Sequence, residues 1–554
     1  MPADISFLSQ TKLHTEEPKL LSSAHLIKCL YQCSSLKDLR QLAKVNKNRL
    51  NAIHYNSICS ACGRLGTEND GNDKENMRNE AIVIYSIAVR NWINLPFDSK
   101  GRNARSCSNI MHIGAKLHID VNTTLYRDLC EVAALLGTDF DVQGVSNCLW
   151  AVATLGATSS NEVLLPVLIS KCFEKARYFD AHSISNCLWA TATLEITNWD
   201  LIRRLYDVCI RRIKDLTHQG LCNCFWAVAI LDETCKNDDV VSPLLKACLE
   251  QLRYFKAVDL SFFFKTVALL GITDQEVIQD ISQICISRVN EFSAQNAVTC
   301  LWAIANLGEE ITGSSFTSII ADLCLQQYKE LKDRDVVVCL WSLAVLDNHR
   351  FSKLSSILRL VILSRYKFIT SHGEAFQCLQ AHYSGIILSE DVLVHFHAIA
   401  REKKLSLSTT GSQDAVAEAL RLVGYSPRLE VSLFDGLVTV DIVIDLCNVQ
   451  NEKKDKHKFG RKREIAIEFD GPWHFMRKTR GSTDKVGPID ARTRLRNSLI
   501  EKSGLFEALI IIPFYEWDEA RRYQGKYKRE GKSSDEPYDS AIDYLKEKIA
   551  FITS

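Results

Sequence analysis

A ten-residue motif occurs twice in this chain with almost the same letters, as NCLWAVATLG and, 39 residues later, as NCLWATATLE. Aligning the chain on the tryptophan extends the motif to six copies, separated by steps of 37 to 39 residues. The anchor residues are Trp150, Trp189, Trp226, Lys265, Trp302 and Trp341, with weaker copies around His112 and Gln380 and a further copy at residues 55–66. A period of this length leaves room for two helices and two turns, which indicates a repeat protein.

The first helix of each repeat has a clear sequence pattern. Positions −5, −2, +2 and +5 from the anchor are mostly apolar, which is typical of one buried helix face. Alanines such as Ala151 and Ala153 allow close helix packing, and Gly156, Gly271 and Gly308 stand where the helix should end. A second amphipathic segment follows in each repeat. One repeat has too little apolar surface to fold alone, so the pattern predicts stacked helical hairpins, an α-solenoid.

Composition narrows the class of protein further. The 554 residues are enough for two or three domains, and the 46% hydrophobic and 24% charged fractions are ordinary for a globular protein. The formal net charge is zero, so a nucleic-acid surface must come from local patches. Most of the 20 cysteines lie in apolar runs and suit a reducing compartment. The pairs Cys59–Cys62 and Cys222–Cys224 lack a second pair at ligand spacing, so no metal is expected.

Targeting and membrane signals are weak. No apolar run is long enough to cross a bilayer, and we expect no membrane partner. The first residues, MPADISFLSQ, lack the features of a secretory signal and of an Arg-rich transit peptide.

Polar residues recur on one side of the first helices, and we expect that side to face a ligand. The recurring residues stand at −7 (Gln143, His182, Gln219, Val258, Gln295 and Arg334) and at −3 (Asn147, Asn186, Asn223, Phe262, Thr299 and Val338). Amides and hydroxyls in consecutive repeats can read the edges of successive unpaired bases. The alternative is that they cap turns or bond neighbouring helices. The tryptophans are better explained by packing between repeats than by base stacking.

The periodicity fades near residue 400, where the pattern changes to a compact mixed domain. A helix (AVAEALRLVG) precedes three strands (RLEVSLF, LVTVDIVIDL and REIAIEFDG), then a helix (DARTRLRNSLIEKSG), a strand (EALIIIPFYEW) and a final helix (SAIDYLKEKIAFI). The predicted order is therefore αβββαβα.

These C-terminal residues resemble the RAP domain, an RNA-binding module of apicomplexan organellar proteins. The resemblance rests on IAIEFDGPWHF, TRLRNSLIEKSG and IIIPFYEW, over residues 437–517. The upstream array is similar to the octotricopeptide and heptatricopeptide repeats that accompany this domain. The resemblance implies action on RNA in a mitochondrion or a plastid, with the repeats choosing the RNA.

The RAP domain is itself similar to PD-(D/E)xK nucleases, which use clustered carboxylates and usually a lysine around a divalent metal. Asp441 and Glu468 fall on adjacent predicted strands, followed by Asp470 and His474. The lysine position is Asp470 instead, which argues against hydrolysis. We therefore expect no cofactor, with Mg²⁺ only if the domain is a nuclease, and the alternative role for Glu468 and Asp470 is to order the following turn.

Basic and aromatic residues coincide around the third predicted strand. Residues 451–480 contain ten Lys and Arg against five acids, and the strand is followed by Trp473, His474 and Phe475. Such a charge run is often only a solvated loop. Beside aromatic side chains it indicates phosphate contacts with stacking on an unpaired nucleotide. The surface is extended by Arg477, Lys478, Arg480, Arg494 and Arg496.

The sequence thus predicts a mainly α protein with an N-terminal cap (residues 1–78, with an acidic loop), a solenoid (79–400) and a RAP domain (401–554, core 437–517). The expected function is binding of single-stranded RNA in an organelle, in the mitochondrion or else in a plastid. The RNA would be organellar rRNA or its fragment ends, and the role either transcript stabilisation or membership of a mitochondrial ribosome among other ribonucleoproteins. The alternatives are a repeat-guided endonuclease and a protein-interaction scaffold.

Overall fold

The computed structural model describes residues 22–67, 74–156, 158, 161–231, 238–346, 349–401, 410–446, 463–476, 486–529 and 539–553. The chain separates into two compact units, unit 1 ending at Leu231 and unit 2 beginning at Asp232. This division falls inside the repeat array. The predicted boundary at residue 400 falls inside unit 2, which holds the later repeats together with the C-terminal domain.

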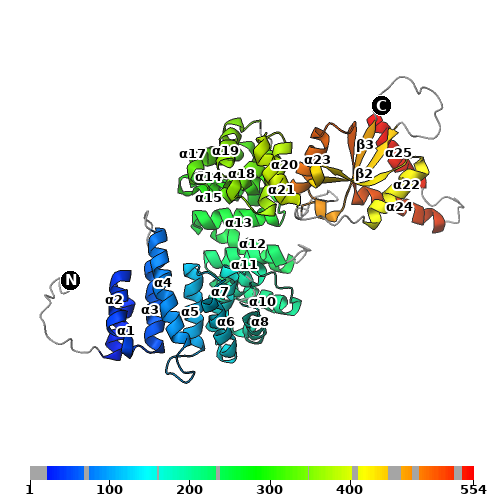
Figure 1. Ribbon diagram of the computed structural model, residues 1–554. Helices are drawn as coiled ribbons and strands as arrows, with labels where there is room; N and C mark the ends of the chain where they lie inside the picture. Colours follow the sequence, from blue (N-terminus) through cyan, green and yellow to red (C-terminus); the bar gives the residue numbers. More distant parts are fainter. Residues whose placement is uncertain are drawn as a thin grey trace. The chain divides into compact units, whose positions relative to one another are not determined.

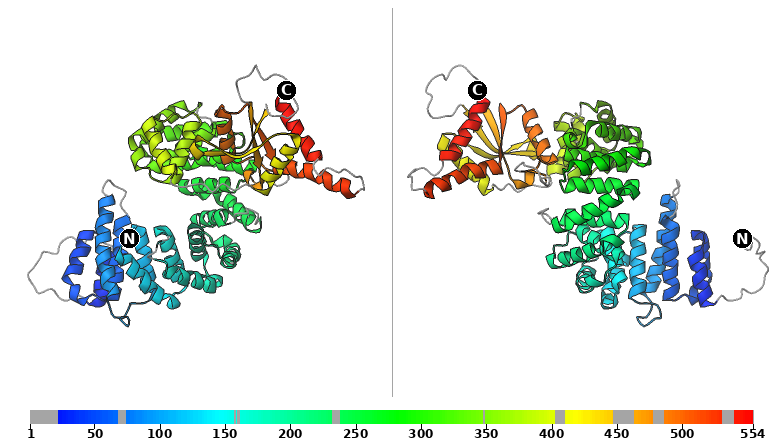
Figure 2. Two further views of the ribbon diagram at one scale, coloured as in Figure 1. Left: turned by 45° about the vertical axis from the view of Figure 1, so that its right-hand side comes forward. Right: turned by 180° about the vertical axis from the view of Figure 1, so that it is seen from behind.

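Unit 1 is built from helical hairpins, each with a first helix (A helix) and a second (B helix), after the N-terminal pair α1 (Ser23–Gln32) and α2 (Leu36–Val45). The A helices are α3 (Ala52–Thr67), α5 (Ala104–Leu117), α7 (Val142–Leu155), α9 (Ala181–Thr193) and α11 (His218–Leu231). The B helices are α4 (Lys74–Ile93), α6 (Thr124–Leu135), α8 (Leu164–Lys175) and α10 (Trp199–Arg211). Each A helix packs on the next A helix, and B helices pack likewise, which is consistent with the predicted solenoid (Figures 1 and 2).

Each A helix begins at a local signal that the sequence repeats. Phe140 and Phe179 are fully buried just before the helix, and the next residues, Asp141 and Asp180, are the N-caps. Each capping carboxylate accepts a backbone N–H three residues on, at 2.7 Å. Gly156 ends α7 at φ 92°, a left-handed conformation that costs glycine little. These signals fix where each hairpin starts and stops.

Unit 2 continues the same hairpin arrangement. Its A helices are α13 (Ala257–Leu269), α15 (Ala294–Leu307), α18 (Asp333–Leu346) and α20 (His372–Tyr383). Its other repeat helices are α12 (Asp238–Gln251), α14 (Gln275–Ser287), α16 (Glu309–Thr312), α17 (Ser314–Gln326), α19 (Ser352–Arg365) and α21 (Glu390–Arg401). The four A helices pack in sequence, α13 on α15, α15 on α18 and α18 on α20.

The C-terminal domain contains α22 (Gly411–Val423), β1 (Arg428–Leu433), β2 (Val438–Asp445), β3 (Glu464–Asp470), α23 (Ala491–Lys502), β4 (Ala508–Pro513), α24 (Phe514–Arg529) and α25 (Asp539–Thr553). The strands form one sheet in the order β1-β2-β3-β4, antiparallel except for the parallel pair β3–β4. The helices outnumber these four strands throughout the described residues, which confirms the predicted mainly α fold with a small C-terminal sheet.

One predicted strand is shorter than expected. Residues 507–517 were predicted as a single strand, but β4 ends at Pro513 and Phe514 begins α24. Proline has no backbone N–H to continue the ladder, and its fixed φ suits the residue that precedes or opens a helix. The apolar letters after Pro513 therefore belong to a helix, in which Trp517 is buried against the domain core.

The sheet has two chemically different faces. One face packs against α22 and α25 and includes Ile465, Ile467 and Phe469 in its apolar core. The alternate residues Glu468 and Asp470 point to the other side, where α23 packs on β2 and β4. In Figure 1, α23 lies between the sheet and the repeat helices of unit 2. The polar face of the sheet is thus closed by a helix rather than open to solvent.

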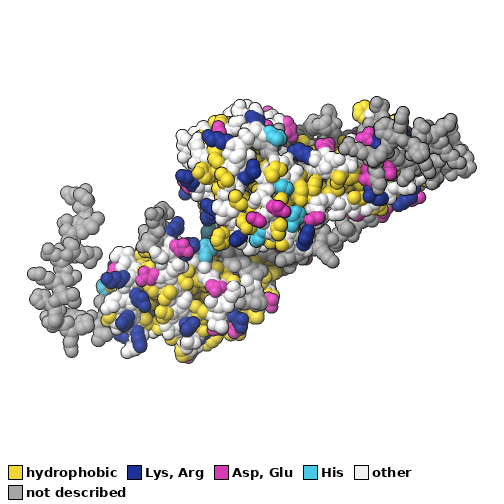
Figure 3. Space-filling model, turned by 45° about the horizontal axis from the view of Figure 1, so that its top comes forward, with side chains coloured by type: hydrophobic (Ala, Val, Ile, Leu, Met, Phe, Trp, Pro, Cys, Tyr) yellow, Lys and Arg dark blue, Asp and Glu magenta, His cyan; other side chains and the backbone are white. Residues whose placement is uncertain are grey.

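Two general features agree with the composition. In the described residues, no helix combines the length and apolar character required to span a bilayer. Figure 3 shows one face of the molecule, on which basic, acidic and hydrophobic side chains are mixed rather than gathered by sign. This mixture fits a formal net charge of zero and directs attention to small local sites.

Candidate nucleic-acid interface

The anchor tryptophans of unit 1 form a stack across repeats. The rings of Trp150 and Trp189 lie 6.4 Å apart, and the ring of His112 lies 4.7 Å from Trp150. All three side chains are half-buried. Contact of this kind joins one A helix to the next, which supports the interpretation of these tryptophans as packing residues.

The two predicted polar positions differ in exposure. The −7 side chains lie on the surface, namely Gln143, His182, Gln219, Val258, Gln295 and Arg334. The −3 side chains are buried or half-buried, namely Asn147, Asn186, Asn223, Phe262, Thr299 and Val338.

Local hydrogen bonds occupy part of the −3 position. The amide nitrogen of Asn186 lies 3.2 Å from Nε2 of His182, and the hydroxyl of Thr299 donates to the backbone carbonyl of Gln295 at 2.8 Å. Asn147 is only 6% exposed. The −7 position is therefore the part of the predicted column best placed to meet a ligand, and the −3 position mainly supports it.

His112 is a candidate that the list of polar columns omits. Its Nδ1 is buried and makes no hydrogen bond within the described residues. Burial, together with the positive charges of Lys116 and His182, lowers the pKa of His112 to about 4. The ring is therefore neutral at physiological pH and keeps one nitrogen free to bond. Its position in the tryptophan register was the sequence signal that pointed to this place.

Unit 2 presents positive charge on its A helices. Lys265 replaces the anchor tryptophan, and its ammonium lies 5.6 Å from the ring centre of Trp302. Burial and then repulsion from Arg334 lower the pKa of Lys265, which places these two cations near each other. Arg334 is exposed. Two neighbouring cations beside an aromatic ring are well suited to a phosphate group.

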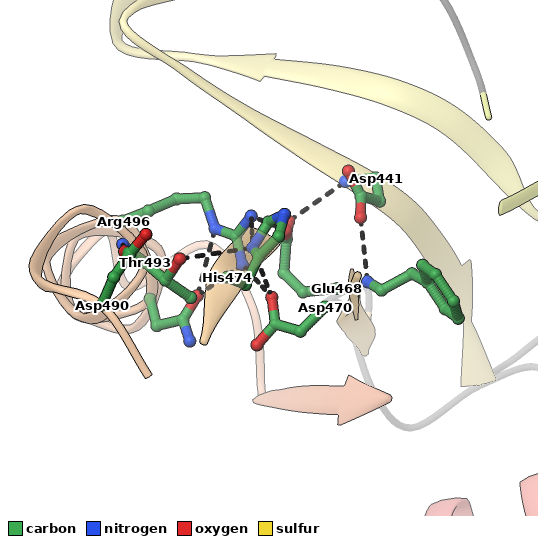
Figure 4. Close-up of polar contacts among 9 residues, drawn as sticks. Asp441, Glu468, Asp470, His474, Asp490, Thr493 and Arg496 are labelled. Atoms are coloured by element: carbon green, nitrogen blue, oxygen red, sulfur yellow. Dashed lines mark hydrogen bonds and ion pairs between the residues drawn. The ribbon is translucent and has the colours of Figure 1, made fainter. Parts of the chain in front are cut away.

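In the C-terminal domain, the predicted acidic residues meet a single arginine (Figure 4). Arg496, from α23, lies 3.0 Å from Oε2 of Glu468 and donates to Oδ1 of Asp470 at 2.7 Å. The same Asp470 oxygen lies 3.0 Å from Nδ1 of His474. Both carboxylates are fully buried. Since buried charges require partners, Arg496 acts as the fixed counter-cation of this site.

Asp441 takes a different position from the one expected of a metal ligand. Its Oδ2 accepts the backbone N–H of Phe469 at 2.8 Å, and its own N–H donates to Oε1 of Glu468 at 3.1 Å. These two bonds tie β2 to β3. Asp441 therefore helps to hold the strands together at the end of the antiparallel pair.

The acidic group does not fit a catalytic Mg²⁺ ion. A guanidinium already lies within hydrogen-bonding distance of both Glu468 and Asp470, where a hard cation would need their oxygens. Among the described residues, no three His, Cys, Asp or Glu side chains come together as a group able to hold a metal. The chemistry of these side chains favours charge pairing within the protein.

The pKa values of the two buried carboxyls move in opposite directions. Burial raises the pKa of Glu468 to about 8, and the charge of Arg496 offsets this only in part. Burial also acts to raise the pKa of Asp470, but the hydrogen bond from His474 and the charge of Arg496 outweigh it and lower that pKa. At neutral pH the site therefore holds an ionised Asp470 and a largely protonated Glu468.

The aromatic residues after β3 divide into an inner and an outer group. Phe475 packs on the rings of Phe514 and Tyr515, about 6 Å between centres. Trp473, two residues earlier, is 67% exposed. Burying an indole ring stabilises a fold, so one left on the surface beside a packed aromatic cluster is available to a partner.

The predicted basic residues have separate outcomes. Arg477, Lys478 and Arg480 lie outside the described residues. Arg496 is paired with acids, as above, and the guanidinium of Arg494 donates to backbone carbonyl groups of the repeats. The density of positive charge along α23 had suggested phosphate contacts, whereas both of these side chains are held by contacts within the protein.

With this geometry in hand, comparison identifies the C-terminal module: residues 467–528 match the RAP domain family. RAP domains are generally RNA-binding, which supports an RNA-binding role for the chain. No curated protein sequence matches the chain. The matched segment begins within β3 and includes the exposed Trp473, α23 and β4.

Proposed function

We propose that this protein binds single-stranded RNA through two surfaces, the exposed −7 positions of the A helices and the outer edge of the RAP domain. The observation that carries the proposal is the match of residues 467–528 to the RAP family together with the exposed Trp473 inside it. An unpaired base offers a flat surface to such a ring, which single strands provide and duplexes do not.

The cellular setting is a further part of the proposal. The resemblance of the repeats to those of organellar RNA factors supports a mitochondrial location, with a plastid as the alternative. There the protein would stabilise or mature a transcript, or bind rRNA fragment ends within a mitochondrial ribosome. Crosslinking the chain to RNA in its native cells and sequencing the fragments tests this setting. Reads clustered on organellar rRNA support it, and scattered reads contradict it.

The binding itself is tested with the purified full-length chain and a labelled single-stranded RNA of mixed sequence. We expect affinity to fall as salt rises, with a log–log slope of about −0.7 per phosphate contact. Trp473→Ala should lower the affinity by about 1–3 kcal/mol because a stacked base is lost.

A matched control separates stacking from general loss of structure. Trp199, at the start of B helix α10, is 49% exposed, so Trp199→Ala removes a surface indole far from the RAP segment in sequence. We expect it to leave RNA affinity unchanged. Equal losses in both variants, or binding that ignores salt, would contradict the proposal, and capture of a protein in place of RNA would favour a scaffold.

A further inference from the structure

The RAP domain packs on the carboxyl-terminal ends of the A helices in unit 2. Its helix α23 contacts α15, α18 and α20. Nη2 of Arg494 donates to the carbonyl oxygens of Ala305 and Asn306 in the last turn of α15, at 2.8 and 3.0 Å. The ammonium of Lys502 donates to the carbonyl of Ser384, the C-cap of α20, at 3.1 Å. Carbonyls at helix ends lack helical partners and carry partial negative charge, so both cations are well placed.

A second contact holds the domain at its first hairpin. The ring of Phe434 stacks on Tyr383 of α20, with centres 4.2 Å apart. Asp435, the next residue, accepts a hydrogen bond from Arg401 of α21 at 2.9 Å. Phe434 and Asp435 both have left-handed backbone conformations, at φ 52° and 58°. Two contacts through different elements restrict rotation of the domain against the last repeats.

Arg494 also reaches the segment that carries the exposed tryptophan. Its Nη1 donates to the carbonyl of Ile489 at 2.8 Å. Ile489 forms an antiparallel bridge with Phe475, and the N–H of Asp490 donates to the carbonyl of His474 at 2.8 Å. One guanidinium therefore links the end of α15 to the strand-like segment next to Trp473.

The end of α15 lies on the side of the A helices that carries the positive charge. Asn306 is four residues after Trp302, so the two side chains share one stripe of the helix. Trp302 lies beneath the ammonium of Lys265, which is close to Arg334. The cations of the repeats and the Trp473 segment are thus linked through α15 and Arg494, within one compact unit.

We propose that Arg494 is a positioning residue that joins these two places into one continuous surface, on which a single RNA strand is bound at both ends at once. The phosphates lie against Lys265 and Arg334, and an unpaired base stacks on Trp473. This inference rests on the proposed RNA-binding function. Because the two places are held at a fixed separation, the second contact is made within the complex and gains from a high effective concentration.

The test uses the full-length chain and labelled oligouridylates of 4, 6, 8, 10, 12 and 16 nucleotides. For the wild type we expect a step in affinity of at least tenfold once the oligomer spans both places. Arg494→Met keeps the aliphatic stem and removes the guanidinium. It should abolish the step, lowering affinity for the longest oligomer at least tenfold while leaving the affinity for the tetramer unchanged.

Three further variants make the test specific. The double variant Trp473→Ala/Arg494→Met should bind the longest oligomer no more weakly than Trp473→Ala alone, because both lose the same second contact. Arg494→Lys should restore part of the step, since one donor group remains. Arg421→Met, which removes an exposed arginine of α22 paired with Glu418, is the matched control and should keep the full step.

The outcomes separate this inference from the function on which it rests. If no oligomer binds to the wild type, the proposed function fails. If the oligomers bind but the step is absent, or if Arg494→Met weakens all lengths equally, only the inference is overturned. Should Arg494→Met not fold, Lys502→Met loosens the same docking at α20 and must reduce the step for the inference to stand.

Discussion

Two pairs of basic side chains in unit 2 serve different purposes although the sequence makes them look alike. Arg334 and Lys265 stand on the A helices, where the first is exposed and the second lies over an aromatic ring. Arg494 and Arg496 stand on α23, where one caps a repeat helix and the other pairs with two buried carboxylates. What makes a cation available to RNA is the absence of a closer partner in the fold, which charge density along the chain does not report.

The largest difference between the two pairs should appear in stability. Arg496→Met removes the counter-cation of Asp470 and Glu468, and we expect local unfolding of β3 and α23 to become easier by about 3–5 kcal/mol. The chain has two units and more than one domain, so a single unfolding midpoint is not a suitable measure. Hydrogen exchange of peptides from β3 and α23, followed by mass spectrometry, reports the local free energy.

Arg334→Met is the matched control for that measurement. The side chain is exposed, so we expect the exchange of its own helix, α18, to change by no more than about 0.5 kcal/mol. If the two arginine variants gave similar small changes, Arg496 would not be the counter-cation that the geometry indicates.

A smaller effect should depend on pH. The pKa of Glu468, about 8 in the folded protein, lies above the ordinary value of about 4.3 for a glutamate. The stability from this group is therefore complete below its ordinary pKa and is lost as the pH rises through about 8. Glu468→Gln keeps a neutral side chain of the same shape. We expect this variant to remove a loss of the order of a few kcal/mol in β3 between pH 5 and pH 9.

Hydrogen exchange at several pH values, corrected for the intrinsic exchange rate, measures this slope in the wild type and the variant. Glu464→Gln is a useful control because this residue of the same strand is paired with Arg428 near the surface. A wild-type β3 whose protection does not change over that range would show that Glu468 is already ionised near pH 5.

The smallest expected effect concerns the exposed cation. Arg334→Met should reduce the salt dependence of RNA binding by about 0.7 in the log–log slope, because one phosphate contact is lost. Arg359→Met, on B helix α19, removes an exposed arginine away from the A-helix side and should leave the slope unchanged. If Arg359→Met lowered the slope as much as Arg334→Met, RNA would not favour the A helices.

The sequence was most informative where structure is periodic. The buried Phe, the capping Asp and the apolar face recur in each repeat, so helix starts such as Val142 and Ala181 follow from local rules. Burial at −3 was harder to foresee, because the register of one repeat on the next decides whether an asparagine such as Asn147 meets solvent. The column was predictable as a set, while the exposure of its members was not.

The RAP domain shows a different limit. Glu468 and Asp470 alternate with the apolar residues of β3, so their common face could be inferred from the strand pattern. The role of Arg496 could not, since its partners are 26 and 28 residues away along the chain and their pairing depends on how α23 crosses the sheet. Docking by Arg494 spans 189 residues, which no local pattern reports.

The way in which Arg494 and Lys502 hold the repeats bears on how such a protein can acquire new targets. Both side chains donate to main-chain oxygens, of Ala305, Asn306 and Ser384, which every residue type except for its side chain shares. Substitutions on the outward faces of these helices leave those oxygens in place. The repeats are therefore free to diverge in the bases they prefer, by natural drift or by design, while the terminal domain stays seated on the same backbone.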